Sequence, residues 1–149
     1  LGSDLTTSGG SLVLAQNVRA SVATWNVING TSISANGYWG PNGDTSATAT
    51  LVSPLLAPCT ATIVGMRVQG NANATGTTTV TLHHSAGGAT ISYVATLITC
   101  TISSGDKSCA DTSNTFSVTG GDLFLLRITS SNWSPSGGSA SIRVACNAT

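Results

Sequence analysis

The stretch Leu97–Ile128, LITCTISSGDKSCADTSNTFSVTGGDLFLLRI, constrains the fold more than any other part of this 149-residue chain. Cys100 and Cys109 lie on either side of a turn-forming Ser-Ser-Gly-Asp segment, and a Gly-Gly-Asp turn then precedes a strongly apolar run. Apolar and polar residues alternate along much of the stretch, and a period of two is the period of a β-strand. The stretch therefore predicts strands that are joined by tight turns and held by a disulfide.

The same alternation recurs along the whole chain, and no segment carries the 3.6-residue apolar period of a helix. We expect strands at Ser11–Ala20, Ala23–Ile28, Thr45–Ser53, Thr60–Gln69, Thr77–His84, Thr90–Ile102, Asn114–Val118, Asp122–Thr129 and Ser139–Cys146, with a further short one at Thr31–Ala35. About nine or ten strands in one domain predict an antiparallel β-sandwich of the jelly-roll type. Residues 1–149 are expected to form this single domain, with residues 1–10 as an extended N-terminal arm.

The cysteines are even in number, which allows three pairings. They are Cys59, Cys100, Cys109 and Cys146. No CxxC or Cys/His spacing typical of zinc occurs, so two disulfides are predicted and no metal site. Disulfides persist outside the reducing cytosol, which favours an extracellular location, on a cell surface or on the exterior of a virion.

A hairpin register follows if Cys100 and Cys109 face each other. Ile102 then faces Lys107, and Ser103–Asp106 forms a four-residue loop, which is a common hairpin length. Directly opposed residues of paired strands bring their Cβ atoms within reach of a disulfide. We therefore expect this bridge, and the other two cysteines form the second bridge by elimination.

Charged residues make up only 7% of the chain, Glu is absent, and the net charge is zero. A neutral chain does not favour nucleic acid or an anionic membrane as a partner. No apolar run reaches the roughly 18 residues of a transmembrane helix, so no membrane insertion is expected. Either the surface is coated with hydrated Ser, Thr and Asn, or other subunits cover much of it. We favour the second alternative, a homo-oligomer, because net charge is what resists association.

The segment Asp122–Thr129 is apolar on both faces, with Phe124 on one face and Leu123 and Leu125 on the other. A strand that is covered on one face only should alternate cleanly. The second face therefore meets either a covering loop or another subunit. We take Leu123 and Leu125 as the candidate subunit interface.

Two earlier segments also have predicted faces. In Thr60–Gln69 a regular strand places Val64 and Met66 on one face and Ile63 on the other. His83 and His84 are adjacent, so they point to opposite faces of a strand and do not easily chelate one ion. His84 is expected to be a core or interface residue.

Catalysis requires a matched acid and base, and this chain offers few. Asp106, Asp111 and Asp122 occupy turn positions, where Asp commonly accepts local backbone hydrogen bonds. No GxSxG nucleophile motif and no Walker or Rossmann glycine pattern is present. We therefore expect no enzyme and no cofactor, and rank a secreted hydrolase below the other functions.

Binding is the alternative to a structural role. Tyr38, Trp39 and Trp133 lie in expected loops, where aromatic rings either hold the face of a sugar or pack against the loops. A carbohydrate- or receptor-binding module would use these three residues. Possible glycosylation sequons start at Asn29, Asn73, Asn132 and Asn147.

The pattern from Pro58 onward has a Pro-Cys lead, ATIVGMRVQ, TTTVTLHH, LITCTISSGDKSC, a Thr-Gly-Gly-Asp turn, LFLLRI and a final SIRVAC. It resembles the compact jelly-roll heads of the C1q/TNF-like class, and domains of this kind in bacteriophage decoration or fibre proteins and in bacterial surface filaments. The resemblance implies a trimer with apolar strands against the three-fold axis. We expect a self-assembling structural protein on a virion or cell exterior, a trimer or filament whose partners are its own copies, a capsid or surface lattice, or glycans.

Overall fold

The computed structural model describes residues 5–8, 11–14, 20–27, 36–57, 59–130, 133, 135 and 137–146. Within these residues the chain forms thirteen strands and one short 3-10 helix, η2 (Ala49–Leu51), and no α-helix. The strands are β1 (Leu5–Ser8), β2 (Ser11–Leu14), β3 (Ala20–Val27), β4 (Tyr38–Trp39), β5 (Thr45–Ser46), β6 (Leu55–Leu56), β7 (Ala61–Gly70), β8 (Thr78–Ser85), β9 (Val94–Ile102), β10 (Ser108–Asp111), β11 (Phe116–Val118), β12 (Leu123–Ser130) and β13 (Gly138–Cys146). The predicted all-β fold is confirmed.

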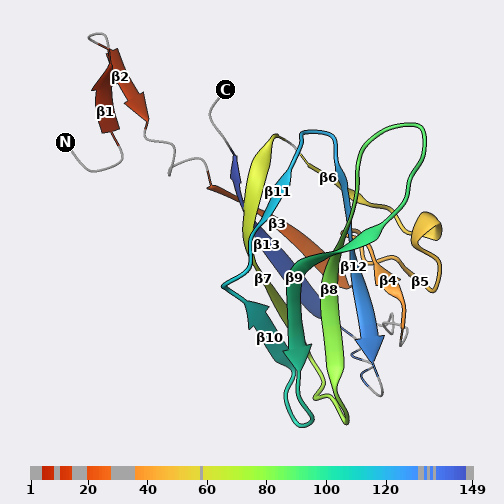
Figure 1. Ribbon diagram of the computed structural model, residues 1–149. Helices are drawn as coiled ribbons and strands as arrows, with labels where there is room; N and C mark the ends of the chain where they lie inside the picture. Colours follow the sequence, from red (N-terminus) through yellow and green to blue (C-terminus); the bar gives the residue numbers. More distant parts are fainter. Residues whose placement is uncertain are drawn as a thin grey trace.

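Two antiparallel sheets pack face to face into a sandwich (Figure 1). The first, here called the β7 sheet, has the strand order β10-β7-β13-β3, and β11 also pairs with β7. The second, here called the β12 sheet, has the order β5-β4-β12-β8-β9, and β6 also pairs with β12. The exposed edge of the β12 sheet on one side is therefore β9.

The chain crosses repeatedly from one sheet to the other. It runs from β6 in the β12 sheet to β7, returns to β8 and β9, crosses to β10 and β11, returns to β12 and ends in β13 of the β7 sheet. Apart from β8–β9 and β4–β5, neighbours within the sandwich sheets are distant in sequence. This wrapped strand order is that of a jelly roll, as the sequence predicts.

The core lies between the sheets and is built by the alternation of each strand. Val80 and Leu82 of β8 are fully buried, and Phe124 and Leu126 of β12 face the same interior. Opposite them the β7 sheet contributes Ile63, Met66, Val68, Ala140, Ile142 and Val144. Burying one large aliphatic side chain stabilises the fold by roughly 1.5–3 kcal/mol, so this interior is the main source of stability.

A bulge interrupts the pairing of β7 with β13. The register shifts between Ile142 and Val144, so that Val64 and Gly65 of β7 oppose a single residue of β13. Ile63 is fully buried beyond the bulge, whereas Val64 is only partly buried. The prediction that Val64 shares a face with Met66 is wrong, because the extra residue turns the strand over.

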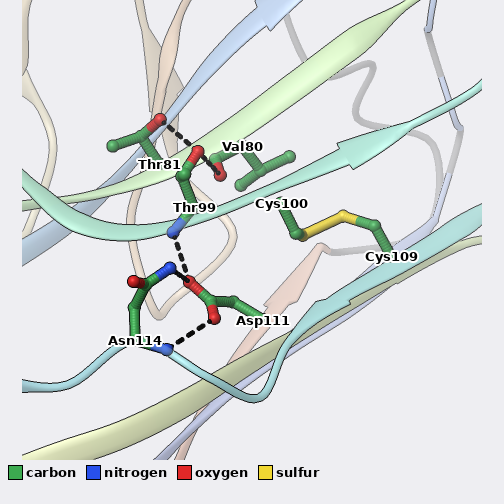
Figure 2. The surroundings of a disulfide bond; sticks show 7 residues. All are labelled: Val80, Thr81, Thr99, Cys100, Cys109, Asp111 and Asn114. Atoms are coloured by element: carbon green, nitrogen blue, oxygen red, sulfur yellow. Dashed lines mark hydrogen bonds between the residues drawn. A yellow bond between two sulfur atoms is a disulfide. The ribbon is translucent and has the colours of Figure 1, made fainter.

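The predicted Cys100–Cys109 disulfide is present, with a Cα–Cα distance of 5.7 Å (Figure 2). The predicted hairpin register around it is wrong. Cys100 pairs with Val80 of β8, and Cys109 pairs with Val68 of β7, so the two cysteines belong to different sheets. The bridge therefore ties the edge of one sheet to the edge of the other, and both cysteines approach it from the interior side.

The second predicted disulfide involves a side chain outside the described residues. Cys59 is disulfide-bonded. The backbone of Cys146 pairs with Ala61, two residues beyond Cys59, but the side chain of Cys146 is not described. The Cys59–Cys146 pairing stays a prediction that agrees with the register of β7 and β13.

The N-terminal segment differs from the extended arm predicted for residues 1–10. β1 and β2 form a hairpin with Leu5 opposite Leu14, and this hairpin is a two-stranded sheet of its own (Figure 1). The expected strand Thr45–Ser53 is also largely replaced, because only β5 is extended there and η2 follows it. The expected strand at Thr31–Ala35 lies outside the described residues.

Candidate functional site

Both tryptophans that were candidates for ligand binding are buried. Trp39 is 0% exposed and Trp133 is 1% exposed. The indole Nε1 of Trp133 donates a hydrogen bond to the carbonyl oxygen of Ala72 at 2.9 Å, and its ring packs against Gly70. The expectation that Trp39 and Trp133 hold a ligand is therefore wrong, because their rings supply core packing instead of an open platform.

Tyr38 lies on the outer face of the β12 sheet beside Arg127 and His83. The Arg127 guanidinium lies 4.8 Å from the centre of the tyrosine ring, and its Nη1 donates a hydrogen bond to the Tyr38 hydroxyl at 2.8 Å. The ring of His83 meets Tyr38 edge-on at 5.5 Å. These contacts leave a half-buried cluster that packs upon itself. A ligand at Tyr38 stays a prediction.

The surroundings of His83 disfavour its charged form. Burial, and secondly the positive charge of Arg127, lower the pKa of His83 below its ordinary value. Its Nδ1 atom is buried without a hydrogen-bond partner. The imidazole therefore acts as a packing partner of Tyr38 in this cluster.

His84 and Asp122 form a buried pair at one end of the core. His84 Nε2 and Asp122 Oδ2 are 2.9 Å apart, and the imidazole lies between the rings of Phe116 and Phe124. The hydrogen-bond partner of the His84 side chain among the described residues is Asp122. The pair fixes the turn before β12 to the end of β8.

Asp122 also fulfils the role predicted for a turn aspartate. Its carboxylate accepts hydrogen bonds from the backbone N–H groups of Thr119 at 2.9 Å and Gly87 at 3.4 Å. Burial alone would raise the pKa of Asp122, but the hydrogen bonds from Thr119, His84 and Gly87 outweigh it and lower the pKa. The group is therefore an anionic structural acceptor.

Asp111 makes a still denser set of contacts beside the disulfide (Figure 2). Its carboxylate accepts hydrogen bonds from the backbone N–H of Thr99 at 3.0 Å, from Asn114 N and Nδ2 at 3.0 and 2.9 Å, and from Ser113 N and Oγ at 3.1 and 3.4 Å. Burial alone would raise the pKa of Asp111, but these bonds lower it to about 2. The hydrogen bond from Thr99 gives a partner to a backbone N–H group of the edge strand β9.

The predicted subunit interface divides into two cases. Leu125 is 0% exposed in the single chain, although it lies on the outer face of the β12 sheet. The chain itself covers Leu125, so the prediction of this residue as a subunit contact is wrong. Leu123 is partly exposed, and its place in an interface stays a prediction.

Sequence reasoning missed the largest exposed apolar side chains, which gather at the start of β9. Leu97 is 72% exposed, Val94 57% and Ile91 47%. Leu51 of η2 and Leu56 of β6 are also exposed. The signal was the segment ISYVATL, which holds no charged residue although it leads into an edge strand. We call Ile91, Val94 and Leu97 the β9 apolar segment.

The remaining predicted sites are tested only in part. Asn73 is exposed in the turn between β7 and β8, as a glycosylation acceptor must be. Asn29, Asn132 and Asn147 lie outside the described residues. Over the described ranges no three His, Cys, Asp or Glu side chains lie close enough to hold a metal ion, and no helix could cross a membrane.

No protein-family model matches this chain, and no curated protein matches its sequence.

Proposed function

We propose that this chain is a structural jelly-roll domain that assembles with copies of itself on the exterior of a virion or a cell. The observation that carries the proposal is the β9 apolar segment, which exposes Val94 and Leu97 on the edge strand of the β12 sheet and Ile91 just before that strand. Natural edge strands usually carry charges, prolines or bulges that prevent pairing. This part of the edge carries no charge and no proline, but its register with β8 shifts between Thr81 and His83. Large apolar side chains that are exposed together favour contact with another chain through the side chains themselves.

The two halves of β9 differ. The Asp111 carboxylate caps the N–H of Thr99, and the Cys100–Cys109 bridge holds β10 against the second half of the strand. In the first half the register with β8 shifts, so the strand is irregular there. Val94 and Leu97 lie in this half, and their exposed side chains support an interface made by side-chain contact.

The β1–β2 hairpin is a second support for assembly. It pairs four residues with four, and within the described part of the chain no ladder joins it to either sandwich sheet. An isolated two-stranded hairpin is marginally stable in water. A hairpin that docks on a neighbouring copy, or adds to its open edge by β-augmentation, gains the packing it lacks alone.

The location and the symmetry are parts of the same proposal. The disulfide is compatible with an extracellular protein. The jelly-roll strand order agrees with the resemblance to C1q/TNF-like heads, from which a trimer follows as the first assembly to test. A phage decoration or fibre head and a surface-filament subunit both fit a neutral domain with so few charges.

The test is the mass of the native chain in solution, measured by light scattering and sedimentation. We expect an oligomer, and we expect Leu97→Lys to dissociate it, because a charge cannot be buried unpaired in an apolar contact. Thr101→Lys is the matched control, since Thr101 is exposed on the same strand beyond the Asp111 cap. A native chain that is monomeric at every concentration would refute the proposal, and so would a Leu97→Lys variant that assembles as well as Thr101→Lys.

A further inference from the structure

A hollow of about 320 Å³ lies on the outer face of the β7 sheet, and its lining includes Asp111 but none of the predicted ligand-binding or subunit-interface residues. Its wall comes from the middle of β7, the end of β10 and the middle of β13. Val64, Met66, Ala110, Thr112 and Ser141 contribute to the lining, together with two arginines. The volume is at the lower end of the range of small-molecule sites, roughly 300–1,000 Å³.

The bulge in β7 shapes this hollow. Where two residues of β7 oppose one residue of β13, the strand bends and the regular outer face is interrupted. Gly65 sits in the bulge, and a Cβ atom there would lie 2.8 Å from the carbonyl oxygen of Asp111. Only glycine lets the backbone of Asp111 approach so closely, and this approach closes one side of the hollow.

The two arginines are Arg67 of β7 and Arg143 of β13, and both line the hollow with exposed side chains. Ser141 pairs with Arg67 across the strands, and Arg143 is two residues further along β13 on the same side. They are diagonal neighbours of like charge, an arrangement that is unfavourable without a counter-charge. Among the described residues no carboxylate forms an ion pair with either of them.

One acid does line the hollow, but its oxygens are already occupied. The Asp111 carboxylate accepts hydrogen bonds from Thr99, Ser113 and Asn114, and within the described residues it forms no ion pair with either arginine. It remains anionic, since these bonds hold its pKa at about 2. Two positive charges and one negative charge leave the hollow with a net charge of one positive.

We propose that this hollow binds a small organic monoanion, namely the carboxylate of an acidic sugar. A guanidinium matches a carboxylate with two parallel hydrogen bonds, and the net charge of the hollow balances one negative charge better than the two of a phosphate. The hydroxyls of Ser141 and Thr112 suit the hydroxyls of a sugar, and Val64 and Ala110 suit its apolar face. The inference is independent of self-assembly, because the residues of the β9 apolar segment do not line the hollow.

The test is isothermal titration calorimetry of the full chain with glucuronate, at fixed ionic strength. We expect saturable binding with a dissociation constant on the order of 1 mM. Glucose and acetate separate the two halves of the ligand: glucose lacks the charge and acetate lacks the sugar, so each should bind at least about tenfold more weakly. Calorimetry reads a monomer and an oligomer alike, so a failure of assembly leaves this result interpretable.

Arg67→Gln and Arg143→Gln should each weaken glucuronate binding by about tenfold or more, since each removes a charged hydrogen-bond donor. Lys107→Gln removes the same charge from an exposed turn outside the hollow and should leave binding unchanged. An unchanged urea midpoint shows that each variant is folded. The proposal is overturned if glucuronate does not bind, if the arginine variants bind as tightly as Lys107→Gln, or if acetate binds as tightly as glucuronate.

Discussion

The Asp111 carboxylate offers the sharpest test of how this fold is held together. It accepts hydrogen bonds from the edge of β9 through Thr99 and from the turn after β10 through Ser113 and Asn114. The two segments come from opposite sheets. Asp111→Asn keeps the size of the side chain but replaces one acceptor oxygen by an NH₂ group. In the variant this NH₂ group faces N–H donors that the carboxylate oxygen accepted from. The variant therefore loses hydrogen-bond acceptors and places donor against donor.

The size of the effect follows from the pKa. A fall from the ordinary value of 3.8 to about 2 corresponds to about 2.5 kcal/mol of stability, at roughly 1.4 kcal/mol for each pH unit. The carboxylate is buried by area but lies near the surface, and solvent screening reduces this figure to about 1–1.5 kcal/mol. The buried donors left unsatisfied in Asp111→Asn add to the loss at neutral pH, so we expect a total of about 1–3 kcal/mol.

The pH dependence has a definite sign. Because the folded protein has the lower pKa, the stabilising contribution is fully present above pH 3.8 and is lost as the pH falls towards 2. Urea unfolding, followed by tryptophan fluorescence, should show a large difference between the native chain and Asp111→Asn at pH 7. The difference should narrow by about 1 kcal/mol at pH 2. Asp122 also has a lowered pKa, but it is present in both proteins and cancels in the comparison.

Asp106→Asn is the matched control for this experiment. Asp106 is an exposed turn residue only five positions away. Its hydrogen bonds, to Ala74 and Ser103, are made by its backbone and not by its carboxylate. The same chemical change there should alter stability by less than about 0.5 kcal/mol. If Asp111→Asn and Asp106→Asn are equally stable at pH 7, or if the Asp111→Asn difference is the same at pH 7 and pH 2, the carboxylate does not act as described.

Two further perturbations test the packing. Replacing Cys100 and Cys109 together by Ala should lower the unfolding free energy by about 3 kcal/mol, because the bridge closes a short loop of the chain. Equal urea midpoints for the native chain and the double variant would contradict this. Gly70→Ala should cost about 1–3 kcal/mol, because the new methyl group would overlap the confined ring of Trp133. A Gly70→Ala variant with native stability and native tryptophan fluorescence would show that this ring has room to move.

The alternation of apolar residues carries much of the fold. β12 and β8 follow their sequence patterns closely, with Val80, Leu82, Phe124 and Leu126 inward, because a regular strand has only two faces. The jelly-roll class follows from many short strands in one domain. The sequence also shows that both faces of β12 are apolar, although it leaves open whether a loop or a subunit covers Leu125.

Local pattern does not reveal where regularity breaks or which strands meet. The bulge at Gly65 reverses the face of half of β7, and it depends on how closely a distant backbone, that of Asp111, approaches. The predicted disulfide between Cys100 and Cys109 is present, but the predicted strand pairing around it is not. A disulfide constrains only the distance between its two cysteines, and a bridge between two sheets meets that constraint as well as a bridge across a hairpin does. Trp39 and Trp133 lie in turn-rich sequence, where composition does not distinguish burial from exposure.

Asp111 connects the features that sequence patterns missed. Its carboxylate caps the N–H of Thr99 in the second half of β9, whereas the exposed Val94 and Leu97 lie in the first half. Its backbone carbonyl packs against Gly65 and closes one side of the hollow between Arg67 and Arg143. The charge of the carboxylate offsets one of the two arginines, so the hollow keeps a net positive charge. Asp111 therefore lies between two open features of the surface, the apolar half of the β9 edge and the positively charged hollow on the β7 sheet.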